Sequence, residues 1–187
     1  INGHPDPSPE RFAAALAAAY ATGAREGGHE VEEIAVGAID APFLANKTEF
    51  ATPAPAAIEA VQAKITAAGH VVLVYPLWLG TMPARLKAFL EQTARANFLL
   101  APAPKPNAWP RKMMAGRSAR VIVTMGMPGF VYRVFFGAHS LKALEGCILR
   151  MSGFRPVRST VLGAVEASSR RRQQMLQTVA RLGSQAR

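Results

Sequence analysis

Residues able to hold a phosphate gather in a short stretch near the start of the chain. His4, Ser8 and Arg11 lie within eight residues, just before a segment with helical periodicity. Backbone amides and the dipole at a helix N-terminus attract anions, and these side chains can donate further hydrogen bonds. The stretch lacks both G-x-G-x-x-G and G-x-x-x-x-G-K-[ST], which disfavours a Rossmann dinucleotide site and a P-loop. The alternative is a loop whose Ser8 only caps the helix.

A second candidate stretch, residues 76–83, directly follows the most apolar run of the chain. It contains Trp78 and Gly80 between prolines. An aromatic wall and a glycine that permits close backbone approach suit the binding of a flat ring system. The alternative is that Trp78 packs in the core.

A third candidate stretch, residues 125–139, begins with a glycine-rich turn after another apolar run. Backbone amides of such a turn can donate hydrogen bonds to the edge of an anionic heterocycle. Tyr132 and His139 are the pair in this stretch able to move protons or stabilise a developing anion. Each is otherwise a satisfied core or surface residue.

Alternating strands and helices must position these three stretches. Buried strands are predicted at 70–75, 119–124 and 156–162, and a more exposed strand at 30–36. Helices are predicted at 9–22, 55–68, 83–94, 140–151 and 168–182, the first with Ser8 as its N-cap and Pro9 at its first position.

Loops are expected to connect these elements at 37–54 and 97–116. Residues 1–3 resemble the tail of a fifth strand, which favours a chain truncated at its N-terminus. The pattern predicts one doubly wound domain over residues 1–187, with a parallel sheet covered on both faces. Ligands of such sheets bind at the carboxyl ends of the strands, where the three stretches meet.

Composition excludes several classes of protein. Half of the 187 residues are apolar, which excludes a disordered chain, and one cysteine excludes a disulfide framework or a cysteine-rich zinc site. Residues 1–104 carry seven basic and ten acidic side chains, whereas residues 105–187 carry fifteen basic and two acidic ones. Neither a membrane-spanning run nor a secretory signal is visible, so we expect a cytoplasmic protein without membrane insertion.

Together, the motifs resemble the flavodoxin-like NAD(P)H:quinone oxidoreductases. The resemblance rests on Gly-His-Pro-Asp in the first stretch, on Tyr-Pro-Leu-Trp and Met-Pro-Ala-Arg-Leu-Lys in the second, and on Val-Thr-Met with the downstream Tyr and His. It implies a three-layer sandwich with a five-stranded parallel sheet in the order 2-1-3-4-5, bound FMN or FAD, and a homodimer. It also implies ping-pong hydride transfer from NAD(P)H through the flavin to a quinone-like small molecule.

The resemblance assigns roles to individual residues. Tyr132 and His139 become the candidates for stabilising charge on the reduced flavin. No metal site is implied. The residues expected to bind the flavin phosphate, ring and pyrimidine edge are His4, Ser8, Arg11, Phe12, Pro76, Leu77, Trp78, Leu79, Gly80, Thr124, Met125 and Gly126.

Three other functions remain open. A flavodoxin-type electron carrier is one, although such carriers are usually acidic and this chain has a net charge of +10. A flavin-binding regulatory subunit of a potassium efflux transporter is another. A nucleic-acid binder is disfavoured, because the three consecutive arginines at 170–172 begin a predicted helix and have no aromatic residues between them. The 97–116 stretch could close the pocket or be a plain connection.

Overall fold

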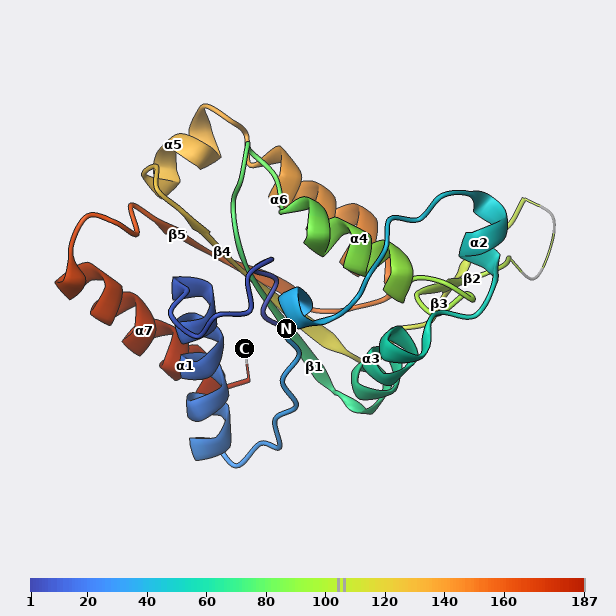
Figure 1. Cartoon of the computed structure of the whole chain (residues 1–187), viewed down its shortest axis with the longest axis horizontal. Helices are drawn as coiled ribbons and strands as arrows, with labels where there is room; N and C mark the ends of the chain where they lie inside the picture. The colour runs from blue at the N-terminus through green and yellow to red at the C-terminus, as the bar shows by residue number, and fades with distance from the viewer. Residues whose placement is uncertain (104, 106, 187) are drawn as a thin grey trace.

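The computed structural model describes residues 1–103, 105 and 107–186. Its central sheet contains three parallel strands, β1 (His70–Pro76), β4 (Ser118–Met125) and β5 (Val157–Gly163), in the order β1-β4-β5 (Figure 1). All three coincide with predicted strands. Their apolar residues alternate between two hydrophobic clusters, so both faces of the sheet are buried. The prediction of a parallel α/β sheet is confirmed.

The predicted strand at 30–36 is wrong. Within the described residues, this segment forms one isolated parallel bridge, from Ala35 to Asn2, and Asn2 also bridges to Val74 of β1. Glu32 and Glu33 point outward into ion pairs with Lys64 and Arg25. The alternation that suggests a strand therefore reflects exposed carboxylates. Among the described residues, the main sheet therefore has three strands and two bridged segments in place of the five strands expected.

Helices cover both faces of the sheet, which gives three layers (Figure 1). On one face lie α1 (Phe12–Glu26) and α7 (Ser169–Ser184), which share a hydrophobic cluster with Val74, Ile122 and Leu162. On the other face lie α3 (Ala56–Ala67), α4 (Ala84–Thr93), α6 (His139–Ala143) and the π-helix η2 (Leu144–Arg150). The exposed thiol of Cys147, the one cysteine of the chain, lies on η2.

Glycines allow α1 and α7 to pack in close contact. A Cβ atom added to Gly23 would overlap the backbone oxygen of Ala180, and one added to Gly183 would overlap the backbone oxygen of Tyr20. Each helix therefore presents a glycine to the backbone of the other. This contact ties the C-terminal helix to the helix that follows the first candidate loop.

The start of α1 differs from the prediction. The helix begins at Phe12, with Arg11 as its N-cap and without a side-chain cap. Ser8 is therefore not the N-cap, and Pro9 is not the first helical residue. The Ser8 carbonyl instead accepts a hydrogen bond from the Arg11 amide at 3.2 Å, which closes a turn ahead of the helix.

Several short elements were not predicted. In the predicted 37–54 loop lie the 3₁₀ helix η1 (Val36–Ala38), which begins one residue earlier, and α2 (Lys47–Ala51). The predicted 97–116 loop contains an antiparallel pair, β2 (Leu100–Ala101) and β3 (Arg111–Lys112), and its residues 104 and 106 lie outside the described residues. The short helix α5 (Gly129–Val134) follows β4. The predicted helix at 140–151 is α6 continued by η2.

Candidate functional site

Asp6 organises the first candidate loop, residues 3–8. Its carboxylate accepts hydrogen bonds from the Ser8 amide at 2.9 Å and from Nε of Arg11 at 2.6 Å. These two contacts hold the pKa of Asp6 below its usual value. Sequence reasoning missed this role, although Asp-Pro-Ser is a recognisable signal for a turn closed by an Asp side chain.

His4 is fixed by the same loop. Its Nδ1 accepts a hydrogen bond from the Asp6 amide at 3.0 Å. Within the described part of the chain, no hydrogen bond involves Nε2 of His4. The first turn of α1 lies beyond the loop, and amides at the start of a helix lack partners within it. A donor side chain and helix amides thus suit an anionic group here.

The second candidate loop turns sharply after β1. Trp78 and Thr81 exchange backbone hydrogen bonds of 2.8 and 3.0 Å across the turn. The two residues between them have positive φ angles, 47° at Leu79 and 79° at Gly80. A leucine is rare in this conformation, and its side chain is fully exposed. An apolar residue held in an unfavourable backbone conformation at a loop tip indicates a functional position.

The structure brings the three loops together at the carboxyl edge of the sheet. The rings of His4 and Trp78 meet edge to face, with centroids 5.6 Å apart. The Leu77 amide donates to the carbonyl of Thr124 at 2.7 Å, which joins the second loop to the end of β4. Met125 then ends the strand and is buried. The predicted convergence of these loops is therefore present.

Open space adjoins the backbone at two glycines of this edge. A Cβ atom added to Gly80 or to Gly126 would meet no atom within 4 Å. Trp78, whose exposed fraction is 47%, stands on the loop that carries Gly80. An aromatic side chain and uncovered backbone are features that a flat ring requires, so these residues fit a flavin.

Tyr132 and His139 lie in different environments. Tyr132 is only 1% exposed, and its hydroxyl lies 2.8 Å from Oγ of Ser140 and accepts from the Leu141 amide at 3.3 Å. His139 is exposed at the start of α6, next to Ser140. The tyrosine therefore anchors the N-terminus of α6, and the histidine is the member of the pair that is accessible.

The N-termini of α1 and α7 meet at a basic corner. The guanidinium of Arg172 lies 5.2 Å from the ring centroid of Phe12, the first residue of α1. Its Nε donates to the Val165 carbonyl at 2.8 Å, and Arg171 donates to the Gly163 carbonyl. Arg171 and Arg172 therefore fix the loop after β5 next to the predicted phosphate site.

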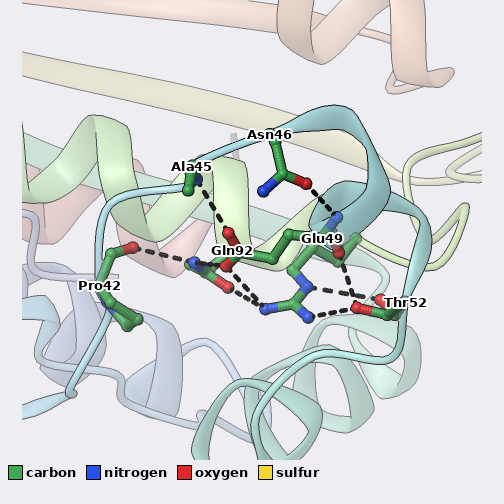
Figure 2. Close-up of polar contacts among 7 residues, drawn as sticks. Pro42, Ala45, Asn46, Glu49, Thr52 and Gln92 are labelled. Carbon is green, nitrogen blue, oxygen red and sulfur yellow. Dashed lines mark hydrogen bonds and ion pairs between the residues drawn. The ribbon is translucent and has the colours of Figure 1, made fainter.

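A polar network around Arg95, which the sequence did not reveal, holds α2 against α4 (Figure 2). The Arg95 side chain is 9% exposed and donates to Glu49, Thr52 and Gln92 at 2.6–3.4 Å. Gln92 also donates to the Pro42 carbonyl at 2.9 Å. Glu49 and Gln92 lie far apart in the sequence, so local spacing gives no signal for this contact. The network fixes the path of residues 42–52.

A second polar cluster, partly buried, lies near the start of the strands. Nε2 of His70 is 3.0 Å from the hydroxyl of Tyr20, and Nδ1 is 2.7 Å from Oγ of Ser118. Burial, assisted by the charge of Arg120, lowers the pKa of His70 to about 4. Burial also raises the pKa of Tyr20 to about 12. Both side chains are therefore neutral at pH 7, and they hold α1 against the start of β1 and β4.

Neither a metal centre nor a membrane span is found in the part of the chain that the structure describes. No group of three or more His, Cys, Asp and Glu residues there could hold a metal ion. No helix among the described residues is both long and apolar enough to span a bilayer.

A family model for the flavodoxin-like fold matches residues 1–185. The chain belongs to this flavodoxin-like family. No curated protein sequence matches it significantly. Among solved structures, Smu.1420 from Streptococcus mutans UA159 shares 27% identity with the flavodoxin-like chain at a TM-score of 0.82, covering 97% of this chain and 96% of its own.

Two more distant structures resemble the flavodoxin-like chain in fold. The NAD(P)H:quinone oxidoreductase from Methanothermobacter marburgensis has 21% identity and a TM-score of 0.79, over 95% of this chain and 91% of its own. The FMN-dependent NADH-azoreductase from Bacillus anthracis, in complex with FMN, has 14% identity and a TM-score of 0.73, over 97% and 94%.

Proposed function

We propose that this protein is a flavin-dependent NAD(P)H oxidoreductase that reduces a quinone or a similar small molecule. The observation that carries the proposal is the meeting of His4, Trp78 and the end of β4 at one edge of the sheet. The similar structures from Methanothermobacter and Bacillus, a quinone oxidoreductase and an FMN-dependent azoreductase, support it. NADH or NADPH is the proposed hydride donor.

The bound flavin, FMN or FAD, supplies the redox chemistry, and this chain supplies its position and electrostatics. His4, Ser8 and the amides near Phe12 hold the phosphate. Arg11 takes part while remaining paired with Asp6, because its Nε is held at 2.6 Å by that carboxylate.

The ring is held by the second loop and by the end of β4. Pro76, Leu77, Trp78, Leu79 and Gly80 form the wall beside it. Thr124, Met125 and Gly126 would lie beside the pyrimidine edge of the ring, where backbone amide donors would stabilise negative charge. The proposed kinetics are ping-pong, with NAD(P)H and the acceptor binding in turn beside the flavin that these residues would hold.

His139 is the proposed side chain for holding a proton or stabilising charge at the ring edge, because it is exposed. A direct role of Tyr132 in stabilising charge on the reduced flavin stays a prediction. Its hydroxyl lies 2.8 Å from Oγ of Ser140, the residue after His139, which supports a positioning role. A His139→Gln variant should therefore lower the rate of turnover, and Tyr132→Phe should lower it less.

Finer features of the family resemblance are proposals as well. We propose a cytoplasmic homodimer with one domain over residues 1–187. The bridges from Asn2 to Ala35 and Val74 support a sheet in the order 2-1-3-4-5, with residues 34–36 and 1–3 as its outer two members.

The test is an anaerobic titration of the purified protein, loaded with FMN or FAD. We expect NADH or NADPH to bleach the absorption of the bound flavin, and an added quinone to restore it. A protein that binds flavin but is not bleached would be an electron carrier or a regulatory subunit. A protein that cannot be loaded with either flavin would refute the proposal.

A further inference from the structure

A cluster of large apolar side chains is exposed on α5 and directly after it. Exposed fractions range from 54% to 77%, which is unusual for neighbouring side chains of this size. The cluster, called here the α5 patch, consists of Phe130, Val134, Phe135 and Phe136. Apolar groups gathered in this way mark a surface that another apolar phase covers.

The α5 patch lies at the functional edge of the molecule. α5 directly follows the carboxyl end of β4, whose last residues approach the proposed flavin ring (Figure 1). On the neighbouring strand β1, the second loop adds Leu79, which is fully exposed, and Trp78. Exposed apolar side chains thus lie on the loops that follow the neighbouring strands β1 and β4, at the edge of the sheet that carries the proposed ring site.

The charge around the α5 patch indicates what covers it. Arg133 is exposed in the middle of the patch, and Lys142 is exposed on the following helix. A second copy of this chain docking through the same patch would bring like charges together, which is unfavourable. A covering surface that is both apolar and anionic is complementary to it.

We propose that the α5 patch docks this protein onto anionic lipid bilayers. The aromatic side chains would enter the boundary between headgroups and acyl chains, and the cations would remain at the headgroups. Docking of this kind requires no spanning helix. It would turn the ring site toward the membrane, so the acceptor class is a lipid-dissolved quinone. This last assignment rests on the proposed reductase function.

The experiment is co-sedimentation of the full chain, loaded with flavin, with two kinds of vesicle. One contains phosphatidylcholine alone, and the other contains equal parts of phosphatidylcholine and phosphatidylglycerol. We expect binding to the anionic vesicles only. Phe135→Ser/Phe136→Ser should abolish binding, and Arg133→Gln should weaken it about fivefold. Phe43→Ser, which removes a phenylalanine that is 75% exposed elsewhere, is the matched control and should bind like wild type.

Two further measurements keep the outcomes distinct. Reduction of a water-soluble benzoquinone by the wild type tests the reductase function without lipid, so a failure of docking and a failure of the reductase function give different results. Gel filtration tests whether the α5 patch is a contact between copies. The proposal would be overturned if the protein did not sediment with the anionic vesicles, or if it sedimented equally with both kinds of vesicle. Unchanged binding by Phe135→Ser/Phe136→Ser would also overturn it. A wild-type dimer that this variant dissociates would assign the patch to a second copy and would also overturn it.

Discussion

Acidification from pH 7 to pH 5 is expected to destabilise this protein through one side chain, His70. The imidazole is held between Tyr20 and Ser118, and its pKa is lowered to about 4 because burial disfavours the charged form. The same side chain has a pKa of 6.5 when exposed in the unfolded chain. Below pH 6.5, His70 therefore binds a proton in the unfolded state but stays neutral in the folded state. The free energy of unfolding therefore keeps its full value above pH 6.5. It falls as the pH is lowered, until His70 is also protonated in the folded state near pH 4.

The size of the effect follows from these two pKa values. Over the whole interval, a difference of about 2.5 units corresponds to a loss of about 3 kcal/mol in the free energy of unfolding. Between pH 7 and pH 5, the linkage relation gives at most about 2 kcal/mol. His70 is only partly buried, so screening by solvent reduces the expected loss to about 1 kcal/mol. The pKa values of Asp6, Glu32 and Glu49 are lowered from their usual range, so these carboxylates stay ionised in both states through most of this window.

Urea unfolding at the two pH values measures this loss, with His70→Gln as the control. The glutamine cannot be protonated but retains groups that can hydrogen-bond to the neighbouring hydroxyls. We expect the wild type to lose about 1 kcal/mol at pH 5 and the variant to lose well under half of that. An equal loss in both proteins would show that other groups are responsible. A wild type without any loss would show that the imidazole is not buried as described.

Four further predictions concern single substitutions. Trp78→Ala should weaken flavin binding about tenfold in a fluorescence titration, with Trp109→Ala, at another exposed tryptophan, leaving it unchanged. Arg95→Ala should lower the free energy of unfolding by about 2 kcal/mol in urea, because it removes a hydrogen-bond partner of the fully buried Gln92; a loss below about 0.5 kcal/mol would contradict the network. Gly183→Val should destabilise by at least about 2 kcal/mol in thermal unfolding, since the backbone of α1 leaves no room for a side chain. Leu79→Gly should stabilise by about 0.5–1 kcal/mol by removing a left-handed leucine, yet weaken flavin binding; a stability loss would refute the assigned strain.

Local patterns predicted the fold where burial alone determines structure. The continuous apolar run at 70–75 could only be a strand buried on both faces, and β1 forms there. The segment 30–36 failed because alternation cannot distinguish a strand from a loop that points its carboxylates outward. Those carboxylates find partners on helices: Glu33 pairs with Arg25 at the end of α1, and Glu32 pairs with Lys64 on α3, which lies far away in the sequence.

The candidate site shows the same division. The loops with His4 and Trp78 were predictable, because every parallel strand delivers its following loop to one edge. The burial of Tyr132 was not, since it depends on Ser140 taking the hydroxyl and on the core accepting the ring. Nor was the Arg95 network, whose contacts depend on how a loop folds back over α4.

The single cysteine on η2 allows the assembly state of the chain to be measured with a label at one position. Because Cys147 is exposed and has no competitor in the sequence, one thiol reagent marks one position per chain. A nitroxide attached there would yield a single spin–spin distance in a symmetric dimer and none in a monomer. The same label would report whether that distance changes when flavin or vesicles are added, without any engineered residue.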